Sequence, residues 1–586
     1  MKLNPLTTCD FYKVSHREMY PEGTELVYSN FTPRSTRLFP TVKSVTDNRV
    51  VFVGLQGFIQ WFLIDVFDDG FFDLPKRRVI DAYKRRMDNA LGAGMVSTEH
   101  LEALHDLGYL PLEIMALPEG SKVDPKVPVY TVYNTLPEFY WLVNYLETVF
   151  SNSIWKPMVA ATTAYRYRQV VEKYLELTGV PKELAGILVH DFSCRGLSGP
   201  YDAQSTGMSH LVFFEGTDTI SAIDYAEEYY GADSDTELVG CSVPATEHSV
   251  MCMGGKETEL ETFRRLIKLH PEGVLAIVSD TWDFWKVITE FAAELKDEIE
   301  ARQPNALGLA KVVFRPDSGD PVDILCGIEV RKLDTEYSSP CNFDEWKEMV
   351  ADEMDNQFCN NLDAENPHCN ETEFWSHNGE VYEVVYEPDL NRHDKTYYYV
   401  DNCGDDVSKC TFTEVVLTPE QKGAVQCLYE TFGGSVTDTG HILLNERVGL
   451  IYGDSITLER CEAICQRLMD KGFATGNVVF GVGSYTYQYV TRDTVGGAMK
   501  ATYGVINGEG IEIYKDPKTD SGEKKSAKGL LVVEEVDGPA DTRFKLKDQA
   551  TWEQVYGEDN AMRVVYRNGR LTEFDNLATI RNRARG

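Results

Sequence analysis

Amphipathic helical stretches alternate with short apolar runs along the middle of this chain. KETELETFRRLIKLH, for example, is followed directly by PEGVLAIVSD. The helical stretches are 163–179, 256–270, 284–303 and 458–472, and the apolar runs are 273–280, 309–320, 448–454 and 477–483. Short buried strands that alternate with helices form parallel sheets, because parallel strands need long crossover connections. The sequence therefore predicts an α/β fold, and the repetition favours a (β/α) barrel.

A strongly acidic segment interrupts this pattern. Residues 331–420 hold 22 Asp and Glu against 6 Lys and Arg. The chain of 586 residues is also long for one hydrophobic core, so we expect two or more packed units. We interpret the segment at about 330–440 as a solvated insertion. Its cysteines and histidines show no standard zinc-ligand spacing, and TYYYVDN and VYEVVYE indicate strands within a small subdomain.

Charge and cysteine usage restrict the compartment and the partners. The formal net charge of −36 argues against non-specific binding to nucleic acid or to an anionic membrane. No run of about 18 apolar residues is present, and the N-terminus lacks an apolar signal core. The 13 cysteines form no CxxC pair, which is typical of reduced thiols. We expect a soluble cytoplasmic protein without nucleic-acid or membrane partners.

Polar residues and glycines end four of the apolar runs. They are Ser279 and Asp280, Arg315 and Asp317, Gly453 and Asp454, and Gly481 and Gly483. A single aspartate at a strand end is usually a helix cap, but four such ends in succession favour a site at the carboxyl ends of the strands. Arginine grips phosphate, aspartate holds Mg²⁺ or sugar hydroxyls, and glycine lets an anion approach the backbone. This set fits a phosphorylated sugar.

A histidine in SVPATEHS (242–249) has two interpretations. His248 lies in a stretch whose proline and small polar residues suit a loop. A lone histidine is more often a structural hydrogen-bonding group than a catalytic one. Imidazole is also a nucleophile near neutral pH, so a catalytic role stays open on the local sequence alone.

Eight motifs resemble the nicotinamide phosphoribosyltransferase family in the same order along the chain. They are CDFYKVSH (9–16), HDFSCRG (190–196), FEGTDT (214–219), SVPATEHS (242–249), FRPDSGDP (314–321), GDSI (453–456), TRD (491–493) and INGEGIEIYKDP (506–517). The resemblance spans nearly the whole chain except about 330–440. Eight ordered matches are far more specific than any single motif.

The resemblance implies a pentosyltransferase that joins nicotinamide to phosphoribosyl pyrophosphate, giving nicotinamide mononucleotide and pyrophosphate in NAD salvage. Mg²⁺ would be its cofactor and ATP a coupled substrate. The implied architecture is an irregular (β/α) barrel at 156–489 that carries the insertion. A second β-rich domain would be built from 1–155 and 490–586, and the active sites would be shared within a homodimer.

The resemblance also assigns roles to individual residues. Tyr12, from the second subunit, and Phe192 would stack on the two faces of the pyridine ring, and Asp218 would accept a hydrogen bond from the carboxamide. His248 would be phosphorylated by ATP, with Glu247 beside it. The expected catalytic group is His248, Glu247, Asp280 and Asp317. The expected substrate contacts are Arg195, Arg315, Gly453, Asp454, Gly483 and Ser484, with Arg492 and Lys500 of the partner subunit and Arg34, Lys515 and Lys524 as further phosphate contacts.

The phosphate loop departs from the glycine-rich form of the family. It reads GVGSY, with Ser484 and Tyr485 where glycines are expected, and Ala498 stands where a phosphate-binding hydroxyl is expected. The sequence leaves two alternatives open. One is the related nicotinate phosphoribosyltransferase, and the other is a non-enzymatic dimer with a binding or signalling role.

Overall fold

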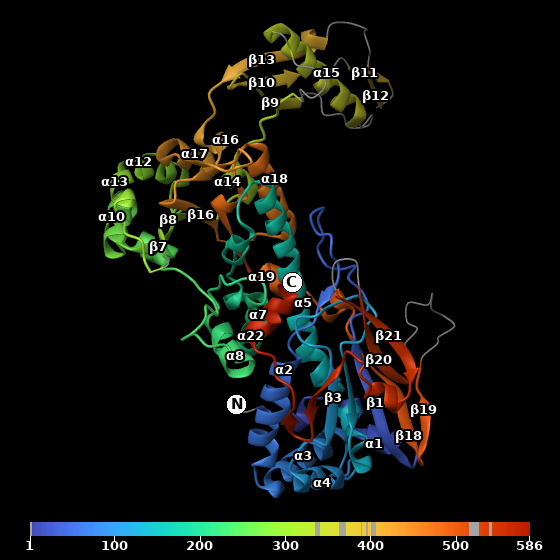
Figure 1. Cartoon of the computed structure of the whole chain (residues 1–586). Helices are drawn as coiled ribbons and strands as arrows, with labels where there is room; N and C mark the ends of the chain where they lie inside the picture. The colour runs from blue at the N-terminus through green and yellow to red at the C-terminus, as the bar shows by residue number, and fades with distance from the viewer. Residues whose placement is uncertain are drawn as a thin grey trace.

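The computed structural model describes most of the chain (Figure 1). The described residues are 3–306, 308–333, 340, 342–361, 371–387, 390–393, 396–399, 406–453, 455–514, 527–537 and 542–586. None of the helices in these ranges is long and apolar enough to cross a membrane.

Five parallel strands form the centre of the α/β unit. Their order is β6 (Val189–Asp191), β17 (Val478–Val482), β16 (Val448–Tyr452), β8 (Ala310–Arg315) and β7 (Gly273–Val278). Helices α10 (Glu259–Leu269) and α18 (Leu458–Asp470) contribute their apolar faces to the same hydrophobic core as the strands. The predicted alternation of helix and parallel strand is confirmed. The predicted helix at 284–303 is a broken helical run, from α11 (Phe284–Lys286) through η9 (Val287–Phe291) and α12 (Ala292–Glu294) to α13 (Lys296–Glu300).

Two irregular segments, the first at residues 215–217 and the second at 241–246, close this sheet into a barrel. The first pairs with β6 through the parallel bridge between Asp191 and Thr217. The second pairs with the first, since Thr217 N donates to Cys241 O at 2.9 Å. It also pairs with β7, since Ala276 N donates to Pro244 O at 2.9 Å. The predicted irregular (β/α) barrel is therefore confirmed.

A seven-stranded antiparallel sheet forms the second unit. Its order is β19 (Glu509–Glu512), β18 (Ala498–Ile506), β1 (Thr24–Thr32), β5 (Tyr130–Asn134), β3 (Leu112–Ala116), β22 (Arg563–Arg567) and β23 (Arg570–Leu571). Segments from both ends of the chain share this sheet, because β1 pairs with β18 and places Asn30 opposite Lys500. The chain thus has the predicted second β-rich domain.

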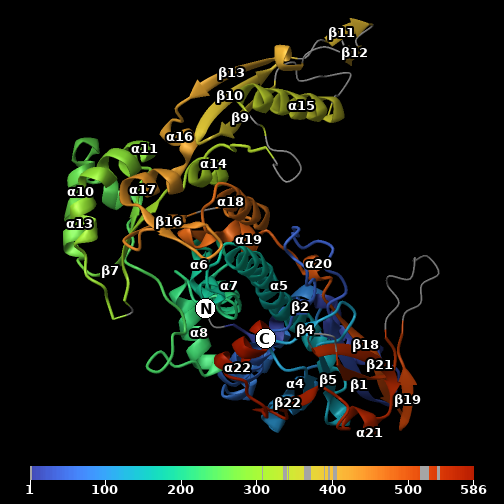
Figure 2. The ribbon, with the colours of Figure 1, turned by 45° about the horizontal axis from the view of Figure 1, so that its top comes forward.

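The long helix α5 (Leu142–Leu177) runs between the barrel and the β-rich sheet (Figure 2). Leu142 and Phe150 belong to the core of the β-rich unit, whereas Ala164 and Val170 belong to the core of the barrel. One rigid helix therefore joins the two cores. Because α5 continues across residue 155, the exact domain boundaries stay a prediction.

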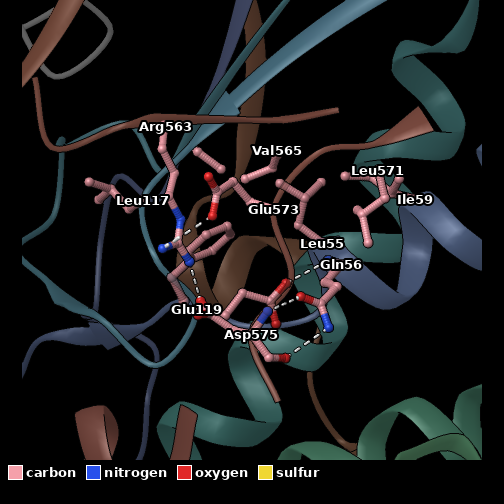
Figure 3. Close-up of a pocket in the computed structure, with 12 residues that line it drawn as sticks. Leu55, Gln56, Ile59, Leu117, Glu119, Arg563, Val565, Leu571, Glu573 and Asp575 are labelled. Carbon is pink, nitrogen blue, oxygen red and sulfur yellow. Dashed lines mark hydrogen bonds and ion pairs between the residues drawn. The ribbon is translucent and has the colours of Figure 1, made fainter. Parts of the chain in front are cut away.

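A polar junction joins the two units near the C-terminus (Figure 3). Glu119 is buried, and its carboxylate accepts a hydrogen bond from Gln56 N at 2.6 Å. Burial raises the pKa of Glu119 to about 7. The Gln56 side chain donates to Asp575 O at 3.0 Å, and the Asp575 carboxylate pairs with Arg563. The same side chain also donates to Tyr229 O, on the barrel side, at 2.8 Å. These hydrogen bonds and this ion pair join the two units in addition to the apolar packing around α5.

The acidic insertion folds as a small unit that projects from the barrel (Figure 1). In it, α15 (Phe343–Asn361) packs on a three-stranded sheet of β13 (Cys410–Val415), β10 (Glu380–Tyr386) and β9 (Glu371–His377). Trp346, Trp375 and Tyr386 fill its core. The predicted strands are present in β10 and in β12 (Thr396–Tyr399).

This unit leaves the barrel at the end opposite the carboxyl ends of the strands. Helix α14 (Pro321–Cys326) follows β8, and α18 follows β16, so both helices run back toward the amino ends of the strands. Their C-terminal ends meet there, where Lys471 Nζ donates to Cys326 O at 2.6 Å. The two connections of the insertion are adjacent, because Ile328 N donates to Gln421 O at 3.0 Å.

Candidate active site

Three loops at one end of the barrel bring a histidine and two carboxylates together: His248 follows the irregular segment that pairs with β7, Asp280 follows β7, and Asp317 follows β8. His248 Nε2 lies 3.4 Å from Asp317 Oδ1 and 4.0 Å from Asp280 Oδ1. The other ring nitrogen of His248 lies 3.4 Å from Thr281 Oγ1. Asp280 Oδ2 accepts hydrogen bonds from Asp317 N at 3.0 Å and from Ser318 Oγ at 2.6 Å. Three residues far apart in the sequence thus form one cluster.

The two carboxylates offer acceptors that described donors do not fill. Asp280 Oδ1 is buried and accepts no hydrogen bond from any described residue. Burial, followed by the charge of Asp280, raises the pKa of Asp317. One ligand atom from each of His248, Asp280 and Asp317 lies within 4.8 Å of the others. A divalent cation would neutralise the carboxylates and fill the orphaned oxygen, so the oxygens of Asp280 and Asp317 fit Mg²⁺.

A half-buried arginine, Arg315, lies beside this cluster. Burial is the largest cause of a lowered pKa at Arg315, and the nearby carboxylates of Asp317 and Asp218 oppose it. The Nε of Arg315 is buried and has no hydrogen-bond acceptor among the described residues. Gly453 follows β16, and a Cβ there would lie 3.4 Å from Arg315 Cδ and 3.5 Å from Asp317 Cβ. Arg315 therefore has a donor available for an anionic group.

Asp218 accepts two side-chain hydrogen bonds. His190 Nε2 lies 2.9 Å from Asp218 Oδ1, and Ser242 Oγ donates to the same oxygen at 2.5 Å. Burial acts to raise the pKa of Asp218, but these hydrogen bonds and the charge of Arg315 lower it overall. Asp218 is thus an ionised acceptor. Neither His190 nor Ser242 was among the site residues expected from the sequence, although His190 begins the HDFSCRG motif.

An aromatic ring lies next to this acceptor. The rings of His190 and Phe192 have centroids 4.6 Å apart. Phe192 is half-buried against apolar side chains of the barrel interior, including Val313 and Ile451. Gly481 allows this placement, because a Cβ there would lie 2.8 Å from the Phe192 ring. One face of a flat heteroaromatic ring could stack here while its polar substituent meets Asp218.

The loop that carries Arg195 packs against the predicted phosphate loop. A Cβ at Gly196 would lie 2.2 Å from Ser484 Oγ, so glycine is required for this close approach. Gly483 precedes the short helix α19 (Ser484–Gln488). Tyr485, at a position where glycine is expected, is 59% exposed and stacks on Tyr489 with ring centroids 5.0 Å apart. The tyrosine side chain therefore lies largely in solvent and does not fill the loop.

The remaining predicted residues lie elsewhere or outside the described ranges. Glu247 precedes α9 (His248–Cys252), and its carboxylate accepts a hydrogen bond from Ser249 Oγ. Four of the predicted site residues are exposed on the β-rich unit, namely Tyr12, Arg34, Arg492 and Lys500. Arg34 Nε donates to Gly496 O at 2.8 Å, and Arg492 lies in α20 (Arg492–Val495). Asp454, Lys515 and Lys524 lie outside the described residues.

Two family models match this chain. One is described as the Nicotinate phosphoribosyltransferase (NAPRTase) family and covers residues 187–361 and 403–569. The other is described as the Nicotinamide phosphoribosyltransferase, N-terminal domain, and covers residues 4–71. The first model alone spans more than half of the chain, including every barrel strand.

The chain belongs to the nicotinate phosphoribosyltransferase family. It is therefore a pentosyltransferase, and the non-enzymatic alternative is excluded. The family named in the sequence analysis is confirmed by its N-terminal model and by the relatives.

Curated relatives extend over almost the whole chain. A protein named nicotinamide phosphoribosyltransferase from Acinetobacter baylyi is 49% identical over 583 residues, which is 99% of this chain and 97% of the relative. A protein of the same name from Mycoplasma pneumoniae is 28% identical and covers 88% of this chain and 93% of the relative.

Two solved structures were also found to be similar. Human nicotinic acid phosphoribosyltransferase matches with a TM-score of 0.48 at 13% identity, over 98% of this chain and 92% of that one. Nicotinate-nucleotide pyrophosphorylase from Pyrococcus furiosus matches with a TM-score of 0.44 at 13% identity, over 99% and 94%.

Proposed function

We propose that this enzyme transfers the phosphoribosyl group of phosphoribosyl pyrophosphate to nicotinamide, giving nicotinamide mononucleotide and pyrophosphate for NAD salvage. The observation that carries the proposal is the ionised Asp218 acceptor beside Phe192, held by His190 and Ser242. Phe192 stacks on the pyridine ring, and Asp218 accepts a hydrogen bond from the carboxamide NH₂, which nicotinate lacks. The 49% identical relative named for this activity supports the same substrate.

The residues around Arg315 suit the departure of pyrophosphate. As the bond from ribose C1 to the pyrophosphate oxygen breaks, positive charge builds on the sugar and negative charge on the leaving group. Arg195 and Arg315 hold the anionic groups, and the nicotinamide nitrogen, positioned by Phe192 and Asp218, forms the new bond to C1. No protein nucleophile is required for this transfer.

Asp280 and Asp317 would hold Mg²⁺, as the unfilled Asp280 Oδ1 suggests. When bound there, the ion would supply positive charge beside the leaving pyrophosphate. Gly453, with Asp454 next to it, allows the ribose to approach Arg315 and Asp317 closely. Gly483 and Ser484 would receive the 5′-phosphate.

We further propose that ATP phosphorylates His248. A ring nitrogen of His248 attacks the γ-phosphorus, the bond from that phosphorus to the β,γ-bridging oxygen breaks, and ADP leaves. Water then hydrolyses the phosphohistidine to histidine and phosphate. The contacts of the imidazole with Thr281 and Asp317 would orient it for this attack.

A homodimer would complete each site. Tyr12 is 61% exposed in a single chain and lies on the β-rich unit. Arg492 and Lys500 are exposed on the same unit. A partner subunit that supplies these three side chains would cover the open face of the pyridine ring and add positive charge at the phosphate.

The cytoplasm is the proposed compartment, because each cysteine whose side chain is described is a free thiol.

The direct test incubates purified protein with phosphoribosyl pyrophosphate and either nicotinamide or nicotinate, with and without ATP. Nicotinamide mononucleotide is the expected main product. Faster turnover of nicotinate would assign the enzyme to the nicotinate-specific relatives.

His248→Ala is expected to abolish the ATP hydrolysis that accompanies turnover. Synthesis of the mononucleotide without ATP should continue, because the groups that bind the base and the pyrophosphate remain. ADP and mononucleotide are measured in the same reaction, with His270→Ala as the control, since His270 ends α10 at the opposite end of the barrel. ATP stimulation that survives in the His248→Ala enzyme would contradict the phosphohistidine.

Replacing residues 330–418 with a short glycine and serine linker is expected to keep kcat/KM within about tenfold of the intact enzyme. The insertion leaves the barrel opposite the site, and its two connections already meet between Ile328 and Gln421. Steady-state kinetics check this result, with near-UV circular dichroism to establish folding. A folded deletion variant without activity would show that the insertion takes part in the reaction.

A further inference from the structure

A buried lysine of α5 contacts the end of the phosphate-loop helix. Lys156 is 8% exposed, and its Nζ donates to Gln488 Oε1 at 2.9 Å. Gln488 is the last residue of α19, the helix that follows Gly483. One hydrogen bond therefore ties the long helix between the two cores to the loop proposed to receive the 5′-phosphate.

The same lysine also reaches the first turn of α7 (Pro200–Leu211), the helix that follows the Arg195 loop. Its Nζ lies 3.4 Å from Asp202 Oδ1. Asp202 in turn accepts a hydrogen bond from Ser198 N at 2.8 Å. Gln488 Nε2 completes the connection by donating to Ser198 Oγ at 2.6 Å. Lys156, Ser198, Asp202 and Gln488 thus form a closed set of contacts, which we name the α5 clamp.

The α5 clamp lies where the two loops touch. Gly196 and Ser484 are in close contact, so a shift of either loop changes the position of the other. Arg195 stands one residue before Gly196, and Gly483 one residue before Ser484. The distance between the groups that would hold the pyrophosphate and the 5′-phosphate therefore depends on this contact.

We propose that Lys156 is a positioning residue that sets the spacing between the Arg195 loop and the Gly483–Ser484 loop, and thereby the affinity for phosphoribosyl pyrophosphate. The inference rests on the proposed function and names a residue that acts through others. Lys156 itself does not contact the substrate. It fixes two loops that do.

The burial of this charge supports a specific role. Burial lowers the pKa of Lys156, so the buried site opposes the charged form, and the Asp202 carboxylate only partly offsets this effect. A buried ion pair rarely stabilises a protein more than well-packed apolar side chains would. An apolar side chain could fill the volume, but it could not bond Gln488 and Asp202 together.

Lys156→Met is expected to raise KM for phosphoribosyl pyrophosphate by about tenfold, because small errors in loop position reduce affinity strongly. KM for nicotinamide should change less than about twofold, since Phe192 and Asp218 keep their own contacts. Initial rates are measured against each substrate in turn. Lys156→Arg, which keeps a donor, should recover part of the loss.

A double-mutant cycle separates this role from simple destabilisation. Ser198→Ala removes the acceptor of Gln488 at an exposed position, so the protein should keep its melting temperature while KM for phosphoribosyl pyrophosphate rises. The double variant should raise KM for phosphoribosyl pyrophosphate by a smaller factor than the product of the two single-variant factors, because both substitutions act through Gln488. Lys173→Met is the matched control, since Lys173 lies on the same helix but bonds Ser44.

The two proposals fail differently. If the unmodified enzyme makes no nicotinamide mononucleotide, the proposed function is wrong. If it does, but folded Lys156→Met and Ser198→Ala enzymes keep an unchanged KM for phosphoribosyl pyrophosphate, the positioning role alone is overturned. The positioning role would also be overturned if KM in the double variant rose by the full product of the two single-variant factors.

Discussion

Asp317→Ala enzyme is expected to lose about a thousandfold in kcat/KM, equivalent to about 4 kcal/mol of transition-state stabilisation. Asp317 is proposed to hold Mg²⁺ at the point where the ribose approaches Arg315. The variant should fold at least as well as the parent, because burial and Asp280 raise the pKa of Asp317 and its charge therefore opposes folding. Steady-state kinetics and thermal melting measure the two effects.

Asp320→Asn is the matched control for this change. Asp320 lies three residues away and caps α14 by accepting a hydrogen bond from Val322 N at 2.9 Å. Asparagine keeps the cap and removes the charge. Similar losses in both variants would show that the loop requires general negative charge rather than the Asp317 carboxylate.

The inactive variant also tests whether sites are shared between subunits. Mixed with Tyr12→Ala enzyme under conditions that exchange chains, it should recover about a quarter of the normal activity. Half of the dimers would be mixed, and one of the two sites in each would be intact. No recovery after confirmed exchange, or full activity of a stable monomer, would contradict the shared site.

Asp218→Asn is expected to reduce the preference for nicotinamide over nicotinate by at least about tenfold. In the proposed binding mode, the ionised Asp218 carboxylate accepts a hydrogen bond from the nicotinamide NH₂ but repels the carboxylate of nicotinate. In a partly desolvated pocket this contrast is worth about 2 to 4 kcal/mol, or about 30- to 1000-fold in kcat/KM. The change should come mainly from better use of nicotinate.

The measurement is the ratio of kcat/KM for the two bases in each enzyme. Asp224→Asn provides the control, because Asp224 is exposed on α8 (Ile220–Tyr230), shortly after the loop of Asp218. A selectivity ratio that stays the same in Asp218→Asn would exclude Asp218 as the group that distinguishes the bases. In that case His190 and Ser242, which hydrogen-bond to Asp218, would not influence the choice between nicotinamide and nicotinate through this carboxylate.

The sequence by itself determined the barrel and the positions from which a site could be built. The alternation of helices with apolar runs requires parallel strands, because only crossover connections join them. Asp280, Arg315, Asp317 and Gly453 follow three of those runs, and the carboxyl ends of barrel strands share one face. Local pattern is sufficient for such features, since each depends on residues close together in the chain.

Only the tertiary structure decided which distant side chains meet. The segments at 215–217 and 241–246 are too short and irregular to show a strand period, yet they close the barrel and carry Asp218 and Ser242 to the site. Lys156 and Gln488 are 332 positions apart and meet because α5 crosses both loops. No local pattern encodes such contacts, because they arise from the packing of whole elements against one another. The same packing put the insertion on the face away from the site, whereas its acidic composition indicated only that it would be exposed to solvent.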